Sequence, residues 1–205
     1  MLLYANSQYT SPYAMSVFVA LKEKNIPFEL RTIDLEHGAN NSPEYATESL
    51  TGRVPTLVDG NFSLSESSAI TEYLEEAYPG VALYPSDPKT KARARQVQAW
   101  IRSDLLPIRQ ERSTDVVFYR PSQIPLSAAA DMASRKLFRA SEALLAHNGD
   151  YLFGSWSIAD VDLALMLNRL VLNGDAVPKK LADYARKQWQ RPSVQEWVSL
   201  KRPKL

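Results

Sequence analysis

The spacing of apolar residues changes near residue 84, and this change constrains the fold more than any other feature of the chain. Before it, short alternating runs are mixed with segments whose apolar residues recur every three or four positions, as in strands and helices. After the proline-containing segment 84–88, only the helical spacing remains. A chain of 205 residues is long enough for two small domains. The sequence therefore predicts an α/β domain at residues 1–80, a linker at 81–88 and an all-helical domain at 89–205.

The first domain begins with a strand–helix–strand pattern. Residues 2–4 form a short apolar run, and Ser11 followed by Pro12 is typical of a helix N-terminus. Residues 28–33 alternate in polarity like a strand. We expect these elements to form one parallel crossover unit.

The segment RVPTLVDGNFSLSES (residues 53–67) predicts a β-hairpin followed by a helix. Residues 56–58 and 62–64 flank the turn residues Asp59 and Gly60. Beyond Ser67, apolar residues recur at helical spacing until a Pro-Gly pair ends the pattern.

The second domain is expected to be a helical bundle. Its helices are predicted from near Pro88 through Leu105, at residues 127–147, 157–172 and 179–190, and after Pro192. The segment 157–172 is apolar nearly all round, which indicates a buried helix.

Composition excludes several classes of function. The net charge is +1, and the one basic cluster, residues 89–95, fits the solvated face of a helix, so we expect neither nucleic acid nor a membrane as partner. The chain has no cysteine, which excludes disulfides, thiolate metal sites and a cysteine nucleophile. No apolar run approaches the roughly 20 residues needed to span a bilayer, and the first ten residues do not resemble a signal peptide. We therefore expect a cytoplasmic protein.

Polar residues near helix starts indicate an anion-binding site. Ser67 can act as a helix cap, or its hydroxyl and the free N–H groups of the helix can bind a carboxylate. Glu66 adds a carboxylate that can hold an ammonium group, so the pair suits an α-amino acid. Ser11 opens the first helix, and because both helices follow strands, its hydroxyl points toward the same end of the sheet.

The Val54–Pro55 peptide bond can be trans or cis. Only about 5–6% of X-Pro bonds in folded proteins are cis, so the trans form is the ordinary expectation. If the bond is cis, the N–H and C=O of Val54 turn outward from the sheet. An extended peptide can then pair with them as an added strand.

Taken together, these motifs resemble the glutathione S-transferase family, in its cytosolic, bacterial-like form with Ser at the N-terminal active-site position. The resemblance rests on Ser11-Pro12-Tyr13, Val54-Pro55 before a hairpin, Ser65-Glu66-Ser67 before the next helix, and Ser157-Ile158-Ala159-Asp160 in the helical half. It covers nearly the whole chain. The fold it implies is a thioredoxin-like α/β domain followed by an all-α bundle, and the last motif resembles the capping box of that bundle.

The resemblance also implies roles for individual residues. Val54 pairs with the cysteinyl backbone of glutathione through a cis Val-Pro peptide, and Glu66 and Ser67 hold the γ-glutamyl end. Arg53 and His37 match positions that contact the glycyl carboxylate in theta-like members, although His37 fits a surface loop histidine equally well.

Ser11 matches the position whose side chain contacts the thiolate, and it is the expected catalytic residue. The hydroxyls of Thr10, Tyr9 and Tyr4 and the amide of Asn6 are rivals for this role. No metal is implied; glutathione is the co-substrate.

Two functions are compatible with these residues. The first is a glutathione transferase, which activates the thiolate for attack on a small electrophile, with peroxidase or disulfide-reductase activity on peroxide or disulfide substrates. The second is a non-catalytic glutathione S-transferase-like binding or regulatory protein, and an isomerase or dehalogenase of the same superfamily also fits. Because members of this family are typically dimers, the resemblance implies a homodimer.

Overall fold

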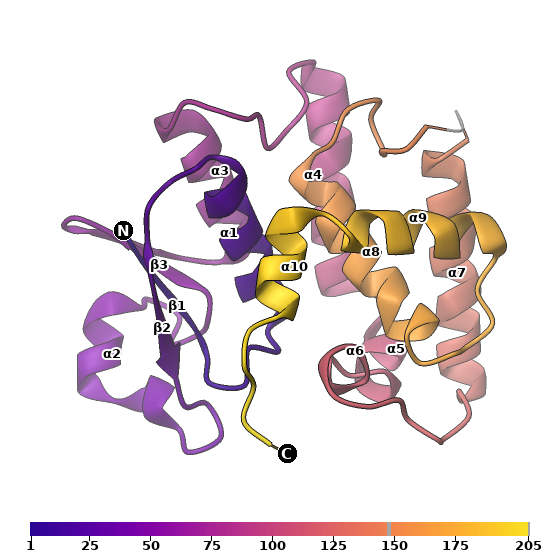
Figure 1. The fold of residues 1–205 in the computed structure, drawn as a ribbon, viewed down its shortest axis with the longest axis horizontal. Helices are drawn as coiled ribbons and strands as arrows, with labels where there is room; N and C mark the ends of the chain where they lie inside the picture. Colours follow the sequence, from indigo (N-terminus) through magenta and orange to yellow (C-terminus); the bar gives the residue numbers. More distant parts are fainter. Residues whose placement is uncertain (147–148, 205) are drawn as a thin grey trace. The chain divides into compact units, whose positions relative to one another are not determined.

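The computed structural model describes residues 1–146 and 149–204, and the chain divides into two compact units. The first contains Met1–Leu83 and Pro192–Leu205, and the second contains Tyr84–Arg191. The expected domains differ in placing residues 192–205 with the helical part. The reason is that α10 (Pro192–Val198) packs against α1 (Pro12–Glu23) (Figure 1). Residue 205 and the expected helix end at His147 lie outside the described residues.

The first unit is built on a four-stranded mixed sheet. Its strands are β1 (Leu2–Asn6), β2 (Glu29–Ile33), β3 (Thr56–Asp59) and β4 (Phe62–Ser65), in the order β2-β1-β3-β4. Strand β1 pairs in parallel with β2 and antiparallel with β3, and β3 pairs antiparallel with β4. The predicted strand–helix–strand unit and hairpin are therefore confirmed.

Helices cover this sheet. Figure 1 shows α2 (Pro43–Glu48) on the other side of the strands from α1 and α10. Helix α3 (Ser67–Ala77) packs against α1, and the short 3₁₀ helix η1 (Ala39–Asn41) precedes α2. In α1 every residue from 14 to 21 is buried, so this helix forms the centre of the unit.

The second unit contains six helices among its described residues. They are α4 (Pro88–Ser103), α5 (Leu106–Glu111), α6 (Asp115–Phe118), α7 (Ala128–Leu144), α8 (Ile158–Val171) and α9 (Lys179–Trp189). Helix α8 is buried nearly all round, as its sequence predicts. The first predicted helix ends earlier than expected, because Leu105 takes a left-handed conformation (φ 60°) and starts α5.

The predicted capping box of α8 is present. The carboxylate of Asp160 accepts hydrogen bonds from the Ser157 N–H at 2.9 Å and the Leu152 N–H at 2.8 Å. Asp160 is fully buried, and burial raises the pKa of its carboxyl. These bonds serve the folding of the bundle, since capping interactions typically contribute about 0.5–2 kcal/mol.

The predicted fold class, a thioredoxin-like domain with an all-helical domain, is confirmed. No helix in the described part of the chain has both the length and the apolar character needed to cross a bilayer.

Lys24, at the end of α1, gives a test of this packing. Its buried ammonium donates to the Tyr78 carbonyl at 2.8 Å and pairs with Glu75 at 3.2 Å. Because Lys24→Ala leaves both groups without their cation, we expect the free energy of unfolding to fall by about 3–5 kcal/mol. The control is Lys179→Ala, which breaks an exposed pair with Asp183 on α9 and should cost about 1 kcal/mol or less. Urea unfolding of both variants measures this; equal losses would contradict the packing described.

Candidate functional site

The strand order brings three chain segments to one end of the sheet. Thr56, at the start of β3, pairs with Tyr4 on one side and with Ser65 on the other. Because β3 runs antiparallel to both neighbours, β1 and β4 end where β3 begins. The predicted site residues Val54, Ser11 and Glu66 follow or precede these strand ends. The fold therefore groups them as the sequence predicts.

The backbone N–H and C=O of Val54 lie just before β3, beside the sheet. The Val54–Pro55 bond is cis, as the resemblance implies. Within the described residues, neither the N–H nor the C=O of Val54 makes a hydrogen bond. Since buried or half-buried backbone groups are normally paired, this donor and acceptor are available to an extended ligand.

Glu66 and Ser67 form the start of α3. Glu66 occupies the cap position with φ 74°, and its side chain makes no capping hydrogen bond. The carboxylate of Glu66 is exposed, whereas Ser67 is buried and is the first helical residue. Ser67 is therefore not a helix cap. Of the two roles considered for it, this leaves the binding of a carboxylate. The N–H groups of this first turn remain available to an anion.

The Ser11 hydroxyl caps α1 and can still donate a hydrogen bond. Its hydroxyl oxygen accepts a hydrogen bond from the Ala14 N–H at 3.2 Å, and its own N–H donates to Asn6 Oδ1 at 2.9 Å. Because a hydroxyl both accepts and donates, capping leaves the Ser11 hydrogen free to be donated to a ligand. The capping and binding readings of Ser11 are thus compatible.

The rival groups in the same loop have other contacts. Asn6 Nδ2 donates to the Thr10 hydroxyl at 2.9 Å, and the Tyr9 ring packs edge-on against Trp197 with centroids 5.9 Å apart. The Tyr4 ring packs edge-on against Tyr45 at 5.3 Å. Ser11 is the candidate whose hydroxyl sits at the helix start itself.

Three residues that the sequence analysis did not identify hold the segment before Val54. The carbonyl oxygen of Arg53 lies 2.8 Å from the Tyr45 hydroxyl, 2.9 Å from that of Thr56 and 3.2 Å from that of Ser49. Isolated Ser, Thr and Tyr residues carry no motif, so nothing in the sequence indicated this cluster. The Arg53 side chain itself is exposed.

His37 lies beyond β2, at the same end of the sheet. Its side chain is 82% exposed, and its Nδ1 lies 2.8 Å from Asp34 Oδ2. The hydrogen bond with Asp34 raises the pKa of His37. His37 is thus a surface histidine with its Nε2 directed away from that bond, and its expected contact with a ligand carboxylate stays a prediction.

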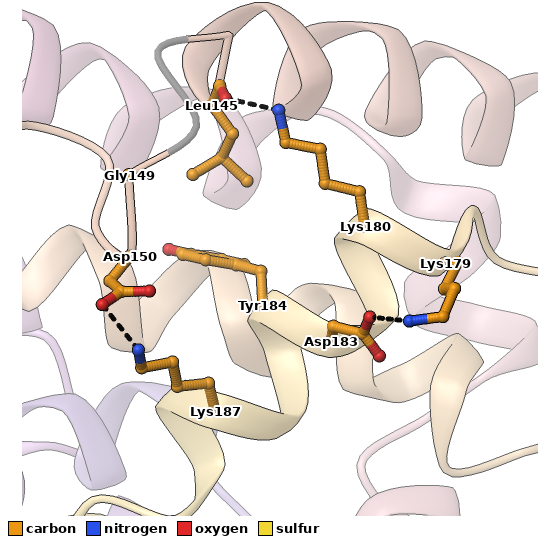
Figure 2. A pocket seen from close by; sticks show the side chains of 8 residues that line it. All are labelled: Leu145, Gly149, Asp150, Lys179, Lys180, Asp183, Tyr184 and Lys187. Carbon is orange, nitrogen blue, oxygen red and sulfur yellow. Dashed lines mark hydrogen bonds and ion pairs between the residues drawn. The ribbon is translucent and has the colours of Figure 1, made fainter.

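The helical unit has a separate pocket of about 440 Å³ that contains none of the predicted site residues. Figure 2 shows that its lysines are paired: Lys180 donates to the Leu145 carbonyl, Lys187 pairs with Asp150, and Lys179 pairs with Asp183. Among residues 1–146 and 149–204, no cluster of three His, Cys, Asp or Glu side chains is placed to hold a metal ion.

Comparison with known proteins agrees with this geometry. The four-stranded sheet with its helices is a thioredoxin-like domain, and the chain continues into a helical domain. Residues 7–82 match the glutathione S-transferase N-terminal domain, and residues 87–202 match the glutathione S-transferase C-terminal domain. The chain belongs to the glutathione S-transferase family, so the predicted family is confirmed, while the role of Ser11 at its active-site position stays a prediction.

Individual relatives support this assignment. A crystal structure of a glutathione transferase homologue from Burkholderia, with bound glutathione, is 48% identical, with a TM-score of 0.80 and coverage of 96% of this chain and 95% of that one. Human glutathione S-transferase theta-2 is 42% identical over 86 residues, which is 42% of this chain and 35% of that protein. Maleylacetoacetate isomerase of Pseudomonas aeruginosa is 39% identical over 111 residues, 53% of this chain and 51% of that protein. The matches to these two curated relatives thus span a third to a half of their lengths.

The contact between His37 and Asp34 predicts a pH dependence. In Asp34→Asn the pKa of His37 should fall toward its ordinary value of 6.5, because the charged partner is lost. The raised pKa in the folded chain means that the pair stabilises the fold below pH 6.5 and ceases to do so as the pH rises through the folded pKa. NMR titration measures this, with His37→Gln assigning the signal of one of the two histidines. An unchanged His37 pKa in Asp34→Asn would show that the contact is absent in solution.

Proposed function

We propose that this protein is a glutathione S-transferase. The proposal rests on the backbone of Val54, which has no hydrogen-bond partner among the described residues and lies at the same sheet end as Glu66, Ser67 and Ser11. An extended peptide with an amino-acid head group and a central thiol matches this set of groups. Family membership and the glutathione-bound relative support the same ligand.

Each part of glutathione has a partner in this arrangement. The γ-glutamyl carboxylate meets the Ser67 hydroxyl and the free N–H groups of α3, while its ammonium meets Glu66. The cysteinyl backbone pairs with Val54 as an added strand. The glycyl carboxylate lies toward the cations Arg53 and His37.

Ser11 then acts on the thiol. Lowering a thiol pKa from about 8.5 by two units takes about 2.7 kcal/mol. One hydrogen bond from Ser11 to the thiolate supplies roughly 1.5–3 kcal/mol, and the N-terminus of α1 adds about 0.3–1 kcal/mol. These two interactions are sufficient, so no ionised side chain is needed.

The thiolate is the nucleophile in each reaction that we consider. Attack on an electrophilic carbon gives a thioether and expels the leaving group; attack on a peroxide or disulfide cleaves the O–O or S–S bond. Because the chain has no cysteine, no mixed disulfide with the protein forms. A second glutathione must supply the other sulfur in peroxide or disulfide reduction.

We further propose that the protein acts as a cytoplasmic homodimer, as the family does. The alternative, a binding or regulatory protein without catalysis, uses the same ligand site but no productive thiolate. Purified protein assayed with glutathione against an alkylating agent, a hydroperoxide and a mixed disulfide separates the two. Turnover with one of these substrates supports the enzyme; glutathione binding without turnover on all three supports the binding protein.

Calorimetry with glutathione tests the site itself. Ser67→Ala should weaken binding about 10- to 100-fold, because it removes a charge-assisted hydrogen bond worth roughly 1.5–3 kcal/mol. Glu66→Ala should weaken binding to a similar degree, since it leaves the ammonium without its partner. Ser63→Ala, at an exposed position of β4, is the control and should bind like the wild type. Equal affinity in all four proteins would refute the assignment of this site.

A further inference from the structure

The loop at residues 7–11, between β1 and α1, is held in a conformation that requires support. Tyr9 has φ 50°, in the left-handed region that non-glycine residues rarely adopt. Such a residue returns to an ordinary conformation unless its surroundings hold it. Ser11 is only two residues further along, so the conformation of Tyr9 sets where the Ser11 hydroxyl lies.

Asn6 supports this loop from the sheet. Its side chain is buried, and Oδ1 accepts from the N–H groups of Thr10 at 3.2 Å and Ser11 at 2.9 Å. Its backbone carbonyl accepts from the Tyr9 N–H at 2.9 Å. These bonds fix the two ends of the loop but leave the Tyr9 carbonyl to another partner.

That partner is Arg202, in the segment after α10. One terminal nitrogen of its guanidinium donates to the carbonyls of Val198 at 2.7 Å and Leu200 at 3.0 Å. The other donates to the carbonyls of Trp197 at 3.0 Å and Tyr9 at 3.2 Å. Arg202 thus joins the C-terminal end of α10 to the loop that carries Ser11.

Trp197 reinforces the same link. It is fully buried, and its ring packs edge-on against both Tyr9 (5.9 Å) and Phe18 of α1 (5.3 Å). Trp197 therefore connects α10 to the helix that begins at Ser11 and to the loop before it. All of these residues belong to the first compact unit.

We propose that Arg202 is a positioning residue for glutathione activation: it holds the Tyr9 carbonyl, and through it the orientation of the Ser11 hydroxyl toward the thiolate. This inference rests on the proposed function. Arg202 acts through the loop and does not touch the ligand. The planar guanidinium suits this task because it directs several N–H donors along fixed directions.

Loss of Arg202 should impair activation of the thiol without weakening the binding of glutathione. Without Arg202, Tyr9 can relax and displace Ser11, and a displacement of about 1 Å at a reacting group can lower a rate about 100-fold. Val54, Glu66 and Ser67 lie on other segments, so they should still hold the peptide. We expect Arg202→Ala to lower kcat/KM about 10-fold or more and to raise the pKa of the bound thiol by about one unit. The Kd for glutathione should change by less than about twofold at a pH well below the pKa of the bound thiol, where the thiol is protonated in both proteins.

The experiment compares Arg202→Ala, Arg202→Lys and Lys201→Ala with the wild type, at a temperature where all are folded. Ultraviolet thiolate absorbance gives the pKa of bound glutathione, and calorimetry gives its Kd. Hydrogen exchange gives the protection of the Thr10 and Ser11 amides, independently of any ligand. Lys201→Ala removes the adjacent exposed cation and should match the wild type. Arg202→Lys keeps a cation at this position, so the pKa of its bound thiol should lie between those of the wild type and Arg202→Ala.

The outcomes separate this inference from the proposed function. A raised thiol pKa and faster exchange at Thr10 and Ser11 in Arg202→Ala, but not in Lys201→Ala, support the positioning role. A thiol pKa equal to that of the wild type overturns it, even if the variant is less stable. If the wild type binds no glutathione, the proposed function fails and the exchange data decide: unchanged protection in Arg202→Ala overturns the link, and lost protection supports it.

Discussion

The central placement of β3 is the constraint on which the rest of the first unit depends. Thr56 pairs with Tyr4 and Ser65 at once, so the segment before β3 must lie beside the ends of β1 and β4. Each of these ends leads into a helix N-terminus, one opened by Ser11 and the other by Glu66 and Ser67. The topology alone therefore brings the backbone of Val54 and two helix N-termini to one edge of the sheet.

The site residues combine structural and binding roles without conflict. Ser11 uses its lone pair to cap α1 and keeps its hydrogen for a ligand. Glu66 holds the cap position of α3 by its backbone, which leaves its carboxylate exposed. The Arg53 carbonyl accepts hydrogen bonds from nearby hydroxyls, while the N–H and C=O of Val54 have no partner in the part of the chain that the structure describes. The fold thus satisfies its own polar groups and leaves a defined set to bind a peptide.

Local signals explain which parts of this structure could be predicted. Pro12 after Ser11, and Asp59-Gly60 between alternating runs, have short-range physical causes and lead directly to a helix start and a hairpin. The placement of α10 and the roles of Asn6 and Arg202 depend on contacts between residues far apart in the sequence. A lone Arg near the end of a chain carries no pattern, and neither do the hydroxyls around Arg53. The left-handed Leu105 was likewise invisible, because leucine ordinarily favours a helix.

We propose that the Ser11 hydroxyl stabilises the thiolate of a glutathione bound along this sheet edge. The most direct test is the pKa of the bound thiol, measured by thiolate absorbance in the wild type and in Ser11→Ala. We expect a wild-type thiol pKa well below the ordinary value of about 8.5 and a return toward that value in Ser11→Ala. A bound thiol with the same pKa in both proteins would contradict it.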